Sequence, residues 1–139
     1  MKSKLITLSL LAAALITAPA LQAQAPAGPR PVWDVPFDFV VGDQTLPAGQ
    51  YTVRQDAPRG TVLIRSLDWK VGQFRIANKV HAGRVPDRSQ LVFRRYGSKN
   101  FLARIWVAGS EYGSELPKSA FESEISRRGP TEAVAMVAR

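Results

Sequence analysis

The chain has no cysteine and only one histidine among its 139 residues, and this excludes several kinds of site. Without cysteine there is no disulfide, no thiolate metal site, no cysteine nucleophile and no lipoprotein acylation site. His81 lacks the neighbouring histidines or acids that a zinc or iron site needs. The sequence therefore predicts no metal, no cofactor and a fold stabilised by an ordinary packed core.

Long apolar runs are also missing, apart from one near the N-terminus. Lys2 and Lys4 precede an apolar run over residues 5–16, and small residues follow, which is the order of a secretory signal peptide. A membrane anchor is the alternative reading. A spanning helix needs roughly 20 apolar residues, however, and Pro19 interrupts this run too early.

We expect cleavage after Ala23, although small residues also offer bonds near Ala20 and Ala25. Residues 1–23 are then a signal peptide, and the mature protein is periplasmic or secreted with no transmembrane segment. Residues 24–31 are rich in Ala, Pro and Gly and predict a flexible linker. Residues 32–139 suit a single β-rich domain.

Acidic residues are in the minority, with 11 Asp and Glu against 19 Lys and Arg and a net charge of +8. Loss of two lysines with the signal peptide leaves 17 basic and 11 acidic residues, a charge of +6. Such a charge favours anionic neighbours, which in the envelope are phospholipid headgroups, lipopolysaccharide phosphates or wall polymers. The basic residues are dispersed, so nucleic acid is not a predicted partner, and a solvated basic surface is the alternative.

Alternating apolar residues predict strands along most of the chain. Val35, Phe37, Phe39 and Val41 alternate with mainly polar residues, and turn residues recur about every ten positions, for example in Leu46–Gly49. The fold class predicted is mainly β, a small antiparallel barrel or sandwich of six or seven strands with one short C-terminal helix.

The second half of the chain adds four expectations. Residues 91–108 predict a hairpin that turns at Gly97–Asn100, and residues 78–88 predict the longest irregular loop. Residues 118–128 have helical composition and end at a Gly-Pro stop signal, and residues 131–138 predict a last strand, with a frayed tail as the alternative.

Two segments carry a resemblance, VPFDFVVGDQTLPAGQYTV (Val35–Val53) and LVFRRYGSKNFLARIWVAGSEYGSELPKS (Leu91–Ser119). They resemble an uncharacterised family of short exported proteins frequent in soil bacteria such as acidobacteria. The resemblance covers nearly the whole mature chain and implies one exported domain, but no activity and no catalytic residue. The segment Leu46–Tyr51 is also similar to the turn and strand of transthyretin-like surface modules, which favours a structural or binding role.

Catalytic groups do not form a recognisable motif. Serines are available alongside His81, but no Gly-x-Ser-x-Gly elbow occurs. The acids nearest in sequence, Asp34 with Asp38 and Glu111 with Glu115, would lie ~13 Å apart on extended chain, too far to act as a pair. The sequence therefore predicts no catalytic residue, and a hydrolase is the least favoured function.

One surface of the predicted hairpin alternates arginines with aromatic rings, and its residues are Arg94, Tyr96, Arg104 and Trp106. We expect these four to share one face of the hairpin, opposite Phe93, Phe101, Ala103 and Ile105. Such a face stacks on sugars or aromatic ligands and hydrogen-bonds anions. The alternative is that Trp106 packs under the helix and the arginines pair with Glu122 or Glu124.

The function predicted is therefore a non-enzymatic exported module that binds an envelope component or a protein partner through this hairpin face. A small barrel that holds an apolar small molecule is the alternative. Its pocket would be lined by the aromatic residues Phe37, Phe39, Phe74 and Phe93.

Overall fold

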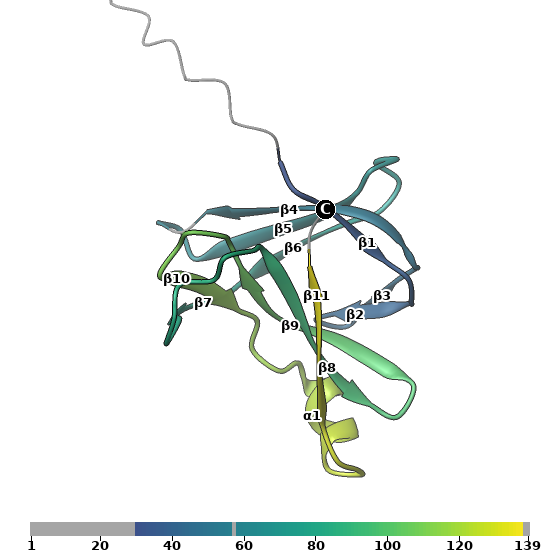
Figure 1. Ribbon diagram of the computed structural model, residues 1–139. Helices are drawn as coiled ribbons and strands as arrows, with labels where there is room; N and C mark the ends of the chain where they lie inside the picture. Colours follow the sequence, from purple (N-terminus) through teal and green to yellow (C-terminus); the bar gives the residue numbers. More distant parts are fainter. Residues whose placement is uncertain (1–29, 57, 138–139) are drawn as a thin grey trace, which may run out of the picture.

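The computed structural model describes residues 30–56 and 58–137, which form two β-sheets and one short helix (Figure 1). The predicted signal peptide, residues 1–23, lies outside these ranges, as does most of the predicted linker. The predicted fold class, mainly β with one short C-terminal helix, is confirmed.

The described residues form eleven strands rather than six or seven, because one predicted strand is divided and segments expected as loops also pair. In chain order the elements are β1 (Val32–Val35), β2 (Phe39–Val41), β3 (Gln44–Leu46), β4 (Gly49–Asp56), β5 (Thr61–Ser66), β6 (Gly72–Ile76), β7 (Asn78–His81), β8 (Gln90–Tyr96), β9 (Lys99–Trp106), β10 (Tyr112–Glu115), α1 (Ala120–Ser126) and β11 (Glu132–Val137).

The four-stranded sheet has the order β1-β4-β5-β6, and the seven-stranded sheet has the order β11-β8-β9-β10-β7 with β2 and β3 attached to β9. Every strand pair is antiparallel except β2 with β9. The described strands do not close into a barrel, so the fold is a two-sheet arrangement with its main core between the sheets.

The predicted strand from Val35 to Val41 is two strands that belong to different sheets. Pro36 has no N–H to donate to a ladder, and the chain leaves the four-stranded sheet there. Asp38 stabilises the crossing, because its Oδ1 accepts the backbone N–H of Ala48 at 2.9 Å. Val35, Phe39 and Val41 are fully buried, as the alternation predicts. The alternation does not hold throughout, because Val40 is buried as well, in the smaller apolar cluster.

Aromatic rings fill the space between the sheets. Phe39 packs edge to face against Tyr51 at 5.0 Å and against Phe93 at 5.5 Å, and Phe37 lies edge-on to Phe93 at 5.3 Å. Three of the four residues expected around an apolar pocket therefore pack against one another. The fourth, Phe74, lies on the outside with 64% of its surface exposed.

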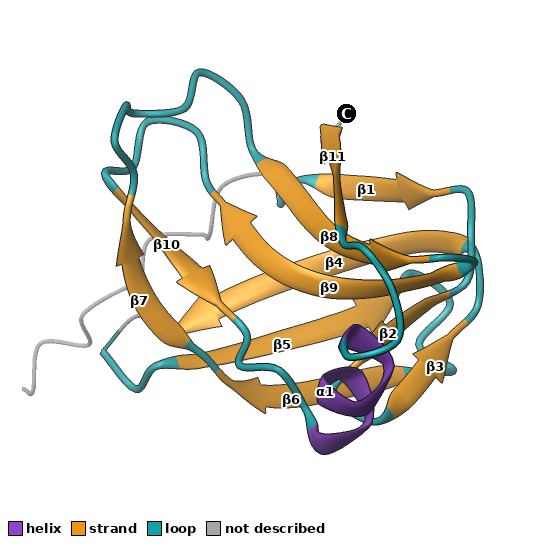
Figure 2. Ribbon diagram, turned by 90° about the horizontal axis from the view of Figure 1, so that it is seen from below, coloured by secondary structure: helices purple, strands orange, loops and turns teal. Residues whose placement is uncertain are grey.

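Strand β6 turns its apolar side chains outward, although Phe74 is one of the residues expected to line an internal pocket. Phe74 and Ile76 point outward, with 64% and 71% exposure, while Gln73 and Arg75 are partly buried. The inner side of β6 faces strands β2 and β3 at the edge where the two sheets separate (Figure 2). Backbone groups there demand hydrogen bonds, which long polar side chains supply.

Arg75 connects the two sheets at this edge. Its Nη2 donates to the carbonyl oxygen of Val41 at 3.1 Å, and Gln73 bonds to Gln44 beside it. Gly42 makes room for the guanidinium, because a Cβ at this position would lie 2.4 Å from it. The absence of a side chain at Gly42 therefore permits Arg75 to reach the carbonyl oxygen of Val41 on the other sheet.

The predicted hairpin is confirmed as β8 and β9, but its faces are not regular. Val92 pairs with Arg104 while Phe93 pairs with Leu102, so Ala103 is an extra residue in a β-bulge. The bulge moves Leu102 into the main core and places Phe101 on the outer face. The expectation that Phe101 shares the inner face with Phe93 is therefore wrong.

The predicted helix is confirmed as α1 and lies against the outer face of β8 and β9. Ser119 caps it by accepting the backbone N–H of Glu122 at 3.1 Å. Ile125 packs on a second, smaller apolar cluster that contains Tyr96 and Phe101. The carboxylate of Glu122 is buried and pairs with Arg94, which fastens the helix to the sheet.

The segment expected as a long irregular loop, residues 78–88, begins with strand β7. This strand pairs with β10, a strand that the sequence pattern missed because Gly109 precedes it and Gly113 lies within it. The last strand, predicted over residues 131–138, is present as β11 and pairs with β8.

Replacing Glu122 with Ala should lower the free energy of unfolding by about 3 kcal/mol, because it leaves the partly buried Arg94 guanidinium without its carboxylate. Urea unfolding measures the loss. Glu124→Ala is the control on the same helix, since its pair with Arg128 is exposed and should be worth less than about 0.5 kcal/mol. Equal losses for the two variants would contradict the anchoring role.

The buried Tyr51 phenol should make the protein less stable at alkaline pH. Burial raises the pKa of this phenol above 10.0, and the charges of Asp68 and Asp38 raise it further. Its contribution to stability is present in full below pH 10.0 and is lost as the pH rises through the folded-state pKa. The free energy of unfolding, measured with urea above pH 10.0, should therefore fall more steeply with pH in the wild type than in Tyr51→Phe. Equal slopes for the two proteins would refute this prediction.

Candidate functional site

The four residues predicted to form a binding face are divided into two pairs. Arg94 and Tyr96 are both bonded to the helix. Arg94 Nη2 donates to Glu122 Oε2 at 3.0 Å and to the carbonyl oxygen of Leu116 at 3.2 Å, and the Tyr96 hydroxyl donates to Glu122 Oε1 at 3.2 Å. Only 17% of the Arg94 side chain is exposed. This pair anchors α1 and offers little surface to a ligand.

Arg104 and Trp106 lie toward the other end of β9 and remain accessible. About half of the Arg104 side chain is exposed (49%), and its Nε donates to Glu115 Oε1 at 2.9 Å. The Trp106 indole is partly buried and rests on Gly113 of β10. The bulge at Ala103 does not separate these two side chains, because both follow it on the same outer face.

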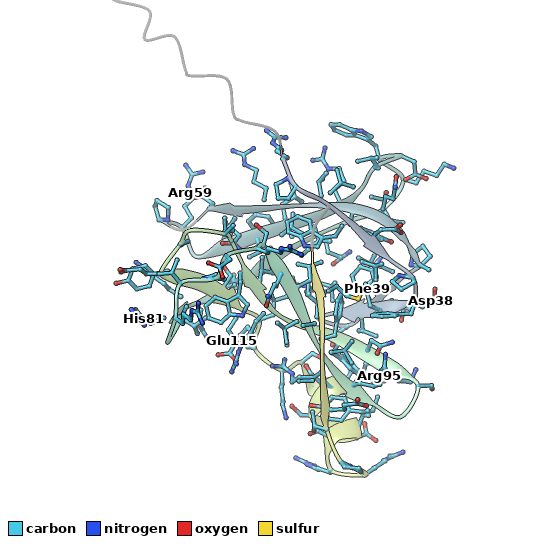
Figure 3. The ribbon with its side chains drawn as sticks, in the orientation of Figure 1. Asp38, Phe39, Arg59, His81, Arg95 and Glu115 are labelled. Carbon is cyan, nitrogen blue, oxygen red and sulfur yellow. The ribbon has the colours of Figure 1, made fainter. Side chains whose placement is uncertain are left out.

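A cavity of about 320 Å³ opens beside this pair, and its lining residues are His81, Ala82, Gly83, Arg84, Pro86, Gln90, Arg104 and Trp106. It forms where the loop after β7 passes the end of the hairpin. In Figure 3, His81 and Glu115 lie on this side of the molecule, and Asp38 and Arg95 lie on the other. We call this cavity the loop–hairpin pocket.

Backbone hydrogen bonds hold the loop in place. Ala82 donates to the carbonyl oxygen of Glu111 at 2.8 Å, and Gly109 donates to that of Pro86 at 2.9 Å. The Ser89 hydroxyl accepts the backbone N–H of Ala108 at 3.1 Å. The loop–hairpin pocket is therefore largely formed before any ligand binds, which lowers the entropic cost of binding.

The chemistry of the pocket is cationic and aromatic. Arg84 and Arg104 supply guanidinium groups and Trp106 supplies a ring. No carboxylate is among the lining residues, although Glu115 accepts a hydrogen bond from Arg104 Nε beside the pocket. Guanidinium groups bind phosphate and carboxylate in a planar fork, and an indole stacks on sugar or aromatic rings. The arrangement suits an anionic ligand with a flat or apolar face.

His81 does not join a catalytic arrangement with the described residues. Its ring lies edge-on to Tyr112 at 5.3 Å, and no hydrogen bond between described residues includes it. Asp38 and Glu115, considered as halves of carboxylate pairs, bond instead to Ala48 and Arg104. Nor do the described residues contain a group of three or more acids and histidines that could hold a metal ion.

Sequence reasoning found Arg104 and Trp106 but missed Arg84 and Gln90. These two residues reach the pocket only because β7 pairs with β10 and carries the following loop to the end of the hairpin. The residues that would have revealed this arrangement are Asn78–His81, which pair with Tyr112–Glu115 in the structure. Neither segment has an apolar alternation strong enough to predict a strand.

Comparison of the chain with protein-family models, curated proteins and solved structures finds no match. The resemblance of Val35–Val53 and Leu91–Ser119 to a family of exported proteins stays a prediction. Among the described residues, no helix has the length and apolar character needed to cross a bilayer.

Substituting Gly113 with Ala should displace the Trp106 ring. The new Cβ would lie 2.4 Å from the indole and 2.6 Å from the carbonyl oxygen of Ile105, and such overpacking costs about 1–3 kcal/mol. Urea unfolding and tryptophan fluorescence measure the change. Gly83→Ala, in the same pocket, meets nothing within 4 Å and should change stability by less than about 0.5 kcal/mol. If Gly113→Ala is equally silent, the indole does not rest on this glycine.

Proposed function

We propose that the protein is a non-enzymatic exported module that binds an anionic component of the cell envelope in the loop–hairpin pocket. The observation that carries this proposal is the joint presence of Arg84, Arg104 and Trp106 around an open cavity with no lining carboxylate. Each group supplies a kind of contact that such a ligand requires. The arginines neutralise and orient a phosphate or carboxylate, and the indole covers the adjoining sugar or apolar surface.

Net charge supports the same ligand class. The mature chain, cleaved as the sequence predicts, carries +6, so anionic surfaces attract it before any specific contact forms. Long-range attraction alone is screened by salt within about 10 Å at 0.1 M ionic strength. Binding that depends on the pocket should outlast that screening, because Trp106 contributes an apolar contact.

The test is co-sedimentation of the mature protein with membranes and with cell wall from its own host, each at low and at high salt. Arg84→Ser should weaken retention about tenfold, because a charge-assisted hydrogen bond is lost. Arg88→Ser is the matched control. It removes the same charge from the same loop, but Arg88 does not line the pocket.

Retention that survives high salt and falls only in Arg84→Ser supports the proposal. Retention that disappears with salt, and that falls equally in both variants, would reduce the interaction to screened attraction by net charge. The proposed binding site would then be wrong.

A further inference from the structure

A second surface stands apart from the loop–hairpin pocket, on the outer face of the four-stranded sheet. One hairpin, β5–β6, exposes four large apolar side chains: Leu67 (45%), Trp69 (74%), Phe74 (64%) and Ile76 (71%). In Figure 1 this sheet lies at the opposite end of the molecule from α1, and none of the described elements covers its outer face. We call these four residues the apolar patch.

The turn between β5 and β6 holds Trp69 outward. Its φ of 64° lies in the left-handed region that bulky residues rarely adopt. Asp68 Oδ1 accepts the Ser66 hydroxyl at 2.6 Å and the backbone N–H of Lys70 at 3.2 Å, and these bonds fix the turn. The hydroxyl bond, followed by the backbone bond, also lowers the pKa of Asp68, which keeps this acceptor ionised. The exposure of Trp69 is therefore built into the turn.

Cations flank the apolar patch. A cavity of about 320 Å³ beside Trp69 includes Arg30, Arg54 and Arg65 and no carboxylate in its lining. The Arg65 guanidinium lies 4.3 Å from the centre of the Trp69 ring. The sheet register places Arg54 beside Leu63, whose other neighbour is Phe74.

The acids on this face are mostly engaged by cations of their own. Asp56 pairs with Arg59 at 3.3 Å, and Asp68 pairs with Lys70 at 3.5 Å. Asp34 lies on β1, at the far edge of the sheet from β6. Positive charge therefore remains unneutralised around Trp69.

We propose that this face docks onto a membrane surface rich in anionic phospholipids, with Trp69 and Phe74 in the interfacial layer and Arg54 and Arg65 on headgroup phosphates. The proposal rests on the function proposed above, in that it places the protein at the envelope. Aromatic rings with a polar or cationic neighbour favour the membrane–water interface. Anionic headgroups attract basic residues held near the surface, and no shape-matched partner is needed.

Charge argues against the other occupant of an apolar sheet face, a second copy of this chain. In a symmetric face-to-face contact, both copies would bring Arg54 and Arg65 into the same interface. Like charges opposed in this way destabilise the contact. An anionic surface removes the same repulsion.

The test is sedimentation with vesicles of equal parts phosphatidylcholine and phosphatidylglycerol, compared with phosphatidylcholine alone. Trp69→Asn should weaken binding to the anionic vesicles about tenfold, because one large apolar contact is lost. Asparagine tolerates the left-handed conformation, so the turn is kept. Phe74→Thr is a second variant that preserves strand preference, and Arg54→Ser should weaken binding about fivefold.

Controls remove the same groups elsewhere. Val85→Thr deletes exposed apolar surface from the loop after β7, and Arg128→Ser deletes an exposed cation at the helix end. Both should bind anionic vesicles as the wild type does. Thermal unfolding confirms that each variant is folded.

Three results would overturn the inference: no binding by the wild type, equal binding to neutral vesicles, or unchanged binding by Trp69→Asn and Phe74→Thr. A dimer in sedimentation velocity that Trp69→Asn dissociates would identify a second copy as the occupant instead. Arg84→Ser separates the two proposals. If it alone loses vesicle binding, the loop–hairpin pocket is the lipid site, and the inference fails while the proposed function stands.

Discussion

The ion pair between the partly buried Arg94 and the buried Glu122 determines where the helix of this molecule lies. A helix of seven residues is not stable alone, and α1 depends on tertiary contacts for its position. Glu122 is only 2% exposed, so its carboxylate must be paired, and the Arg94 guanidinium and the Tyr96 hydroxyl provide the partners on β8. The one helix of the described chain is thereby fixed to the seven-stranded sheet, and the outer face of the other sheet stays open.

The same pair divides the outer face of the β8–β9 hairpin between two roles. Near the turn, Arg94 and Tyr96 serve the helix, while beyond the bulge Arg104 and Trp106 border the loop–hairpin pocket. The bulge at Ala103 makes the division possible. It turns Phe101 toward the helix and Leu102 toward the core within one strand, so that both faces of β9 are packed near the turn.

Local patterns sufficed for elements whose two faces differ strongly in environment. Tyr51 and Val53 alternate with polar residues and are buried, and the hairpin and helix lie where composition and turn residues indicate. Strand β6 shows why the rest could not be predicted. Alternation defines two faces but does not say which one is buried, and at an open edge the inner face requires Arg75 and Gln73 rather than Phe74. Similarly, Arg104 and Trp106 could be predicted from the local pattern of one strand. Arg84 could not, because the pairing of β7 with β10 brings it to the same pocket.

Cations lying over aromatic rings explain how a basic chain exposes so many rings. Arg65 covers Trp69 at 4.3 Å, and Lys79 covers Tyr112 at 3.8 Å. In each contact the cation is attracted to the face of the ring and stabilises it at the surface. The contact also keeps a positive charge beside the ring, and this charge opposes self-association. Phe74 has no such cation among the described residues, although its ring is 64% exposed. The apolar patch thus combines a ring that a cation already covers with one that has no cation over it, and the proposed docking onto an anionic membrane surface uses both.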